Sequence, residues 1–249
     1  MSTIAVRPEA PPVDRSWGPL FVIAGIGSIA FVALLLAALA LDVVAPPPVH
    51  GGAATLEFIA AHTSVYVAEQ VLWIAPSILA VLVFVALYFA LAAAHRSLAL
   101  IGSVVGGVAY ALLLAIPTSS RGALSLVYLS ERYMAAAPGD RATYAIAAET
   151  IIAENNTPTI AGVLATVGIL LVSIPMLRSV LPRWVAWLGV ATGAIGIVSE
   201  LLRYAVPQFY WGYGILLWVW FVAVGIALIR LGMRVRGRTG AGFRTEGDG

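Results

Sequence analysis

The chain has 249 residues, of which 61% are hydrophobic and only 10% charged, and its formal net charge is +2. Soluble domains carry about 25% charged residues, so this composition predicts a protein that crosses a membrane several times, and the scattered basic residues argue against nucleic-acid binding. Cysteine and lysine are both absent, which excludes disulfides, thiolate metal sites, a cysteine nucleophile and a Schiff-base lysine.

The N-terminal part predicts a tail, one span and a short surface helix. Residues 1–16 are polar and rich in proline, and we expect a disordered cytoplasmic tail. The apolar stretch 17–41 is long enough to cross a bilayer, and it is too long for a signal peptide. After a proline-rich linker, Thr55 is predicted to cap a short helix at the membrane interface.

The next two spans are predicted to form a hairpin. Residues 66–94 contain one acidic residue, Glu69, at their polar edge and are otherwise compatible with lipid. Pro76 predicts a kink about two turns further on. Only 95–97 separate this span from the third, 98–116, and such a short connection requires antiparallel helices.

A long connection follows, and its composition is helical. Two segments, 121–137 and 141–155, have apolar faces but also carry charges, so they are too polar to span a membrane and too apolar to be solvated on all sides. We therefore predict a two-helix extracytoplasmic cap over 121–156, between spans three and four.

Three further spans complete a predicted membrane domain over 17–232. They cover 159–177, 184–206 and 210–229, and a basic cytoplasmic tail follows over 233–249. The fold class is thus all-α, with six transmembrane helices.

The arginines predict the orientation of these spans. With both termini inside, ten arginines lie on the inner side and three in outer loops, which agrees with the positive-inside rule. We therefore expect an inner cell membrane protein with both ends cytoplasmic. The residues expected at the outer interface are Tyr66, Tyr210, Trp211 and Tyr213. The inner set is Arg7, Arg15, Arg96, Arg178, Arg183, Arg230, Arg234, Arg236, Arg238 and Arg244; the outer set is Arg121, Arg132 and Arg141.

Two glycine-rich runs suggest an internal repeat. Residues 96–106 align without gaps onto 183–193, and both runs open a span at the inner face. Each contains a Gly-x-x-x-Gly motif, which favours close helix packing. These faces could pack inside the chain or join two copies of it.

Polar residues in the outer half of the predicted spans are the candidate site. Glu200 and Arg203 are three residues apart in the fifth span, so they share a face and can form an ion pair. Charges within a span usually face the bundle interior or a watery cavity. Either a ligand pocket or a structural clamp fits this pattern. The candidate ligand-binding residues are Glu69, Gln70, Trp73, Asn155, Asn156, Thr157, Glu200 and Arg203.

Other reactive residue types give weaker signals. His50, Glu57 and His62 are metal ligands by type, but their spacing puts no pair on one helical face, so we predict no metal site. Ser119 and Ser120 have no histidine partner at a recognisable spacing, and we expect no cofactor.

Several segments resemble the bacterial membrane family catalogued as domain of unknown function 4386. The resemblance covers about residues 17–232, and its most specific parts are Glu69-Gln70 and 155–158. It implies a six-span helical membrane protein and no established activity. The segments are AEQVLWIAPSI (68–78), SLALIGSVVGGVAYALLLAIPT (97–118), LVYLSERYMAA (126–136), AENNTPTIAGVLATVGILLVS (153–173) and WVAWLGVATGAIGIVSELLR (184–203).

Three classes of function follow from the sequence. We expect a non-enzymatic protein that binds or passes a small or amphiphilic ligand in an outward-facing polar pocket. The first alternative is a membrane enzyme, similar to a terpene cyclase, in which Glu69 or Glu200 is a general acid. The second is a structural or assembly partner. The expected partners are membrane lipids, the ligand and possible further copies of the chain.

Overall fold

The computed structural model describes residues 14–46, 51–116, 118–119 and 122–241, and within these ranges the fold is all-α apart from one minimal β-hairpin. The 3-10 helix η1 (Arg15–Trp17) leads into the first long helix. The further elements are α1 (Gly18–Val44), α2 (Gly52–Ala61), α3 (Thr63–Ile74), α4 (Ser77–Ala115), β1 (Thr118–Ser119), β2 (Gly122–Ala123), α5 (Ser125–Ala135), α6 (Arg141–Asn155), α7 (Ile160–Met176), α8 (Arg183–Leu201) and α9 (Pro207–Ala241).

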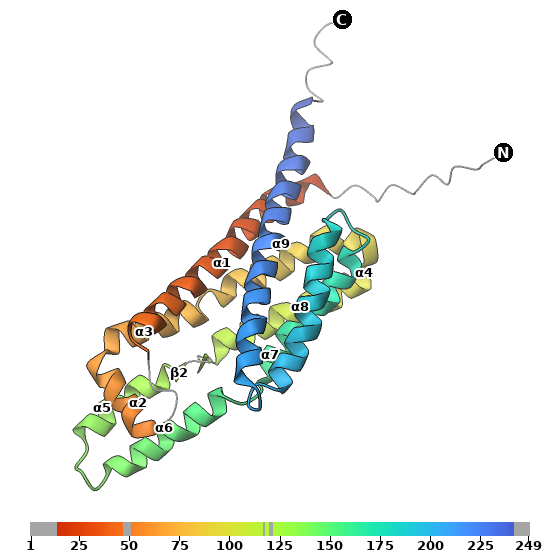
Figure 1. The fold of residues 1–249 in the computed structure, drawn as a ribbon. Coiled ribbons are helices and arrows are strands. Elements are labelled where there is room, and N and C mark those ends of the chain that lie inside the picture. The colour runs from red at the N-terminus through yellow and green to blue at the C-terminus, as the bar shows by residue number, and fades with distance from the viewer. Residues whose placement is uncertain (1–13, 47–50, 117, 120–121, 242–249) are drawn as a thin grey trace, which may run out of the picture.

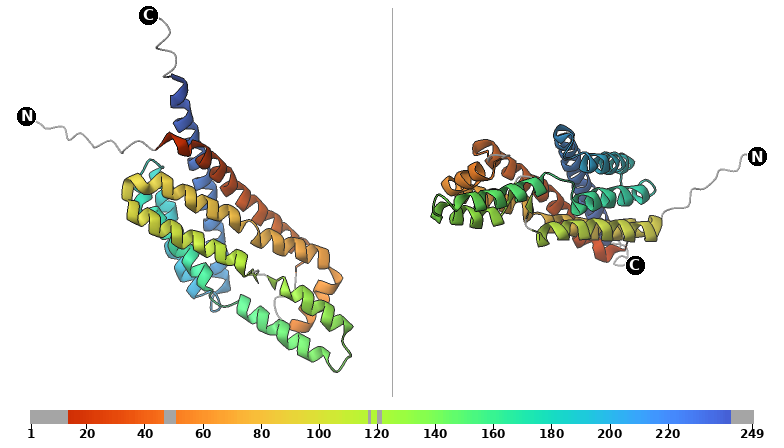
Figure 2. Two further views of the ribbon diagram at one scale, coloured as in Figure 1. Left: turned by 180° about the vertical axis from the view of Figure 1, so that it is seen from behind. Right: turned by 90° about the horizontal axis from the view of Figure 1, so that it is seen from below.

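Helix α4 is two antiparallel arms. Its backbone is helical except at His95, where φ is −163° and ψ is 91°, and the chain turns back on itself there. The predicted hairpin is confirmed, and Figure 2 shows the two arms side by side. The helix is interrupted at the predicted place, because α3 ends at Ile74 and α4 begins at Ser77, while Ala75 and Pro76 keep helical backbone angles.

The long helices alternate in direction. Figure 1 shows the start of α1 and the end of α9 at one end of the molecule, where the tip of the α4 hairpin and the α7–α8 turn also lie. We call this the terminal end. Helices α2, α5 and α6 lie at the opposite end.

Helix α7 packs between α8 and the second arm of α4, and glycines make both contacts close. On one side, a Cβ added at Gly102 would lie 2.8 Å from the backbone nitrogen of Val172. On the other, a Cβ at Gly193 would lie 2.7 Å from that of Leu170. The two Gly-x-x-x-Gly motifs therefore pack within the chain, and a second copy of the chain would have to use another face.

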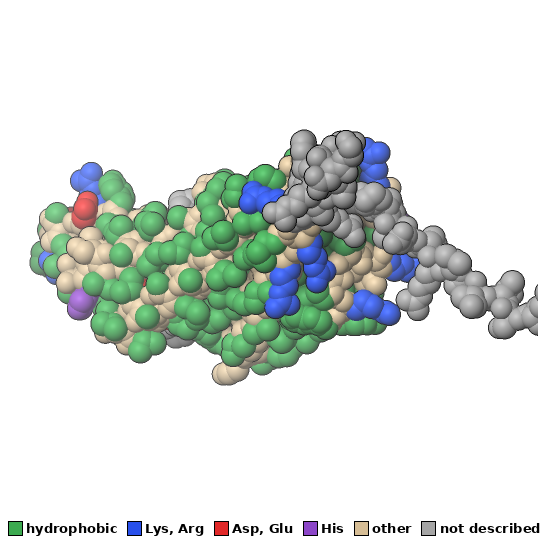
Figure 3. Space-filling model, turned by 90° about the horizontal axis from the view of Figure 1, so that it is seen from above, with side chains coloured by type: hydrophobic (Ala, Val, Ile, Leu, Met, Phe, Trp, Pro, Cys, Tyr) green, Lys and Arg blue, Asp and Glu red, His purple; other side chains and the backbone are tan. Residues whose placement is uncertain are grey.

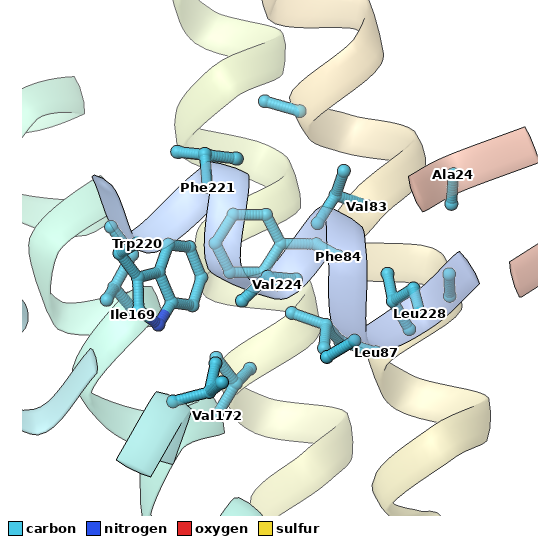
Figure 4. Close-up of a cluster of buried hydrophobic side chains, with 14 of the residues drawn as sticks. Ala24, Val83, Phe84, Leu87, Ile169, Val172, Trp220, Phe221, Val224 and Leu228 are labelled. Atoms are coloured by element: carbon cyan, nitrogen blue, oxygen red, sulfur yellow. The ribbon is translucent and has the colours of Figure 1, made fainter. Parts of the chain in front are cut away.

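The bundle core lies where α4, α7 and α9 meet. Figure 4 shows Phe84 beside Val224 and near Trp220, and the Phe84 and Trp220 ring centroids are 6.4 Å apart. Helix α1 closes the core from the α9 side. Gly25 and Gly225 face each other there, since a Cβ at Gly25 would lie 2.6 Å from the carbonyl oxygen of Gly225.

The predicted cap is a three-helix unit with its own core. Helices α5 and α6 pack on each other and on α2, which the sequence placed separately at the interface. We call α2, α5 and α6 the end module. Its core is distinct from that of the bundle and consists of Leu56, Ile59, Tyr66, Ala123, Leu126, Tyr133, Ala148 and Ile152.

A carboxylate fixes α2 to α6. Glu149 Oε2 accepts hydrogen bonds from the backbone nitrogens of Gly51 (3.1 Å) and Gly52 (2.6 Å) at the N-terminus of α2, where a negative charge is favoured. Thr55 is therefore not the cap that the sequence predicted: Gly51, with φ at +95°, occupies that position, and Thr55 is buried within the helix.

The last two spans also differ from their predicted ends. Helix α8 ends at Leu201, so Arg203 lies in the turn between α8 and α9. Helix α9 continues to Ala241, and part of the predicted C-terminal tail is helical. The predictions made for His50, Ser120, Arg121, residues 1–13 and residues 242–249 lie outside the described residues.

Candidate functional site

The surface divides into a hydrophobic middle and two polar ends. Figure 3 shows arginines gathered at the terminal end, a few charged side chains at the opposite end, and mostly hydrophobic side chains between them. Five stretches of the described chain are long and apolar enough to cross a membrane, and one of them, Thr63–Ala115, has 53 residues and turns back at His95. These features indicate a multi-pass membrane protein.

One face of α3 gathers polar and aromatic side chains at the junction between the bundle and the end module. Tyr66, Glu69, Gln70 and Trp73 follow the i, i+3, i+4, i+7 spacing of a single helix face, and we call this set the α3 polar face. Tyr66, Glu69 and Gln70 are at most 1% exposed. Burial of three such polar groups requires partners, because an unpaired polar group is costly away from water.

The β-hairpin provides several of these partners. Strands β1 and β2 pair antiparallel, with Ser119 opposite Gly122. Ser119 Oγ donates a hydrogen bond to Gln70 Oε1 at 2.8 Å. The Tyr66 hydroxyl accepts from the backbone nitrogen of Ala123 at 3.1 Å and donates to its carbonyl oxygen at 3.2 Å. The hairpin is thus held directly on the α3 polar face.

Glycine at position 122 permits this close approach. A Cβ at Gly122 would collide with the Tyr66 hydroxyl and would lie 3.2 Å from Gln70 Nε2. Tyr66 is therefore buried against the hairpin, and the prediction that it marks the outer interface is wrong. Tyr213 is buried as well, at 5% exposed.

The α3 polar face also contains hydrogen-bonding capacity that the described residues leave unused. Trp73 Nε1 donates to Glu69 Oε1 at 3.2 Å, which orients the carboxylate. Gln70 Nε2, in contrast, is buried and has no acceptor among the described residues. A buried amide donor without an acceptor can bind a group that accepts a hydrogen bond, such as a hydroxyl or the oxygen of an amide.

A second polar cluster lies where α7, α8 and α9 meet, and we call it the Glu200–Arg203 clamp. Arg203 Nη1 lies 3.6 Å from Glu200 Oε2, so the predicted pair forms. The Arg203 guanidinium also lies over the Tyr210 ring, 4.5 Å from its centroid. The cation–π contact and the ion pair together stabilise the buried Arg203 guanidinium, which is shielded from water.

The carboxylate of the clamp reaches the start of α7. A Cβ at Gly162 would lie 2.5 Å from the Glu200 carboxyl carbon, so the glycine makes room for the carboxylate. The Thr159 backbone and the Tyr210 side chain also hydrogen-bond to Glu200. The clamp thus joins the end of α8 to the first turns of α7 and α9.

The two clusters draw their contacts from different elements. Helix α3 packs on α1, α2, α4 and β1, whereas Glu200 is held by α7, α9 and the α8–α9 turn. The predicted convergence of Glu69 with Glu200 and Arg203 stays a prediction.

The three polar residues between α6 and α7 have mainly local roles. The Asn156 side chain donates to the Ile152 carbonyl oxygen at 3.0 Å, and Thr157 Oγ1 donates to the Glu154 carbonyl oxygen at 2.8 Å. Both bonds finish the last turn of α6. Asn155 is 7% exposed, and its Nδ2 has no acceptor among the described residues.

The residues considered as metal ligands have other partners. Tyr133 donates to Glu57 Oε1 at 3.0 Å, and His62 stacks on Phe58 with ring centroids 4.6 Å apart. Within the described residues, His, Asp and Glu form no group of three that could hold a metal ion.

Sequence reasoning missed Tyr66 and Gly122 as parts of the site. Tyr66 lies one helical turn before Gln70, and this spacing is a signal that the sequence does contain. The role of Gly122 depends on a contact between residues 56 positions apart in the chain, which no local pattern reveals.

Comparison with protein families identifies the family of the chain. Residues 20–234 match the family described as Domain of unknown function (DUF4386). The chain therefore belongs to this family, as its sequence resemblance predicted. No curated protein and no solved structure gives a match.

Proposed function

We propose that the chain crosses the inner cell membrane six times, with both termini in the cytoplasm and the end module outside. The six spans are α1, α3 with the first arm of α4, the second arm of α4, α7, α8 and α9. The start of α1 and the end of α9 lie together at the terminal end, which supports an even number of crossings. The arginines at that end support its cytoplasmic side, since positive loops are retained there.

A reporter that is active only in the cytoplasm tests this orientation. It should be active when fused after Arg236 and inactive when inserted near Gly139, in the turn between α5 and α6. An active reporter at Gly139 would contradict the proposal, because it would invert or remove a span.

We also propose that the protein is a non-enzymatic binder of a small or amphiphilic molecule, and that the α3 polar face receives the polar group of that molecule. The observation that carries this proposal is the unpaired amide donor of Gln70, completely buried beside the Glu69 carboxylate. Native proteins rarely leave such a donor unused, and each case calls for a partner. A bound hydroxyl or amide would accept from Gln70 and donate to Glu69.

The negative charge of Glu69 indicates which ligands the site would bind. Glu69 disfavours an anionic head group by like-charge repulsion, whereas a neutral hydroxyl or amide meets both side chains. Trp73 and the neighbouring bundle are apolar and favour an alkyl chain. A neutral amphiphile fits this arrangement best.

Binding of 1-decanol to the detergent-purified protein tests the proposal. We expect the alcohol to raise the thermal unfolding midpoint and to change Trp fluorescence, while decanoate has a much smaller effect. Gln70→Leu should abolish the response to 1-decanol, and Gln208→Leu, in an exposed position of α9, is the matched control. Equal responses of both variants would contradict the proposal.

The two alternatives predict different observations. A membrane enzyme would convert its ligand, so the bound molecule extracted after incubation would differ from the one added. An assembly partner would give no amphiphile response and would co-purify with another membrane protein.

A further inference from the structure

A shallow groove lies on the surface of the α4 hairpin, and none of its lining residues belongs to the α3 polar face. Its volume is about 310 Å³. It is lined by Val85 and Tyr88 of the first arm and by Leu100, Ser103, Val104, Gly107 and Val108 of the second arm. The five residues of the second arm form a single helical stripe, so the groove follows the helix axis between the two arms.

An exposed arginine lies at the end of this stripe. Arg96 precedes Leu100 by four residues, which places it on the same face, one turn nearer the tip of the hairpin. It forms no ion pair with any residue that the structure describes. The second arm also begins here, with His95 Nδ1 accepting from the Leu98 backbone nitrogen at 3.2 Å, and the positive end of a helix dipole adds to the charge of Arg96.

The length of the stripe matches one membrane leaflet. Arg96 and Val108 are twelve residues apart, or about 18 Å along a helix. One half of a hydrocarbon core about 30 Å thick is about 15 Å. An acyl chain that begins at the level of Arg96 would therefore reach the end of the groove close to the middle of the bilayer.

We propose that this groove binds one acyl chain of an anionic phospholipid whose phosphate is held by Arg96. Apolar burial alone does not favour this acyl chain over those of other lipids, because all lipid tails are as apolar as the groove. Shape and charge therefore determine the binding: Gly107 leaves space for the chain, and Arg96 selects the anionic head group. One such arginine near the surface favours an anionic lipid about fivefold.

A pair of glycine variants tests the groove. A Cβ at Gly107 has only one neighbour, Phe84 Cβ at 4.0 Å, so Gly107→Leu fills the groove without an internal clash. Gly214 in α9 has no atom within 4 Å of such a Cβ among the described residues, and Gly214→Leu is the matched control. The protein is reconstituted in bilayers of phosphatidylcholine with one tenth phosphatidylglycerol, extracted in mild detergent, and its retained lipid is counted by native mass spectrometry.

We expect wild type and Gly214→Leu to retain phosphatidylglycerol and Gly107→Leu to lose it. Arg96→Gln should lower the ratio of phosphatidylglycerol to phosphatidylcholine about fivefold, whereas Arg234→Gln should leave it unchanged. Equal retention by the two glycine variants, or an unchanged ratio in Arg96→Gln, would overturn the proposal.

A second measurement does not depend on the fold of the filled variant. The chain has no cysteine, so Ile101→Cys beside the groove and Ile215→Cys on α9 each accept a single fluorescent label. Brominated phosphatidylglycerol should quench the label at position 101 more than brominated phosphatidylcholine does, and both should quench equally at position 215. Equal quenching by the two lipids at position 101 would also overturn the proposal.

Discussion

Two buried carboxylates, Glu69 on α3 and Glu200 on α8, are held in different ways. Glu200 has its cation, Arg203, at 3.6 Å, an aromatic ring over that cation, and contacts to the starts of two helices. Glu69 accepts from Trp73 on its own helix and lies beside an amide donor without an acceptor. Each cluster contains one buried atom without a hydrogen bond among the described residues, Glu200 Oε2 in the first and Gln70 Nε2 in the second, but Glu200 Oε2 has a cation beside it. We therefore propose a structural role for Glu200, which is paired with a cation, and a binding role for Glu69.

The largest effect should come from removing the cation of the clamp. Arg203→Ala leaves Glu200 buried without its partner, and we expect a loss of about 3–5 kcal/mol in the free energy of unfolding. Thermal unfolding in detergent measures this loss, with the exposed Arg178→Ala as a control. The double variant Arg203→Ala, Glu200→Ala should recover much of the stability. A double variant as unstable as Arg203→Ala would show that the pair is not the clamp.

A smaller loss is expected where the α3 polar face meets the β-hairpin. Tyr66→Phe removes the hydroxyl that bonds both backbone groups of Ala123 and leaves them unpaired, which costs about 1–3 kcal/mol. Hydrogen exchange at residues 122–123 should become faster than in wild type. Tyr128→Phe, in an exposed position of α5, provides the comparison. Unchanged exchange would mean that the hydroxyl does not hold the hairpin.

Glu69→Gln should change stability least among the buried variants. Glutamine keeps the size of the side chain and an oxygen that accepts from Trp73, so we expect a change within about 0.5 kcal/mol. The same variant should lose the response to 1-decanol. A large loss of stability would show that Glu69 has a structural role like that of Glu200, which would contradict the different roles proposed for them.

A titration in the end module provides a reference outside both clusters. The hydrogen bond to Glu57 raises the pKa of Tyr133 above its usual value of 10.0. The protonated tyrosine is thus favoured in the folded state, so its contribution to stability is complete below pH 10 and is lost as the pH rises through the raised pKa. Unfolding midpoints at alkaline pH should fall more steeply in wild type than in Tyr133→Phe. Parallel curves would contradict this assignment.

Local sequence patterns predicted the α4 hairpin and the Glu200–Arg203 ion pair. The features that depend on tertiary contacts could not be predicted. Three residues around His95 leave no other connection between two spans, and a spacing of three places Glu200 near Arg203 in any helical turn. The role of α2 in the end module depends on Glu149, almost a hundred residues away, so the sequence of α2 alone could not show it. Tyr66 was misplaced because a tyrosine at the edge of a span usually lies at the interface.

The tight turn at His95 has a consequence for the biogenesis of the chain. The two arms of α4 have no loop between them. One arm therefore cannot insert into the bilayer alone, and both must insert together during synthesis. Helix α7 is made later, after the whole end module has been synthesised. Helix α7, which completes the packing of the hairpin, is thus made after it. Until then the two arms of α4 lie in the lipid with their packing glycines exposed. Chaperones of membrane insertion would find their substrate at this stage of synthesis.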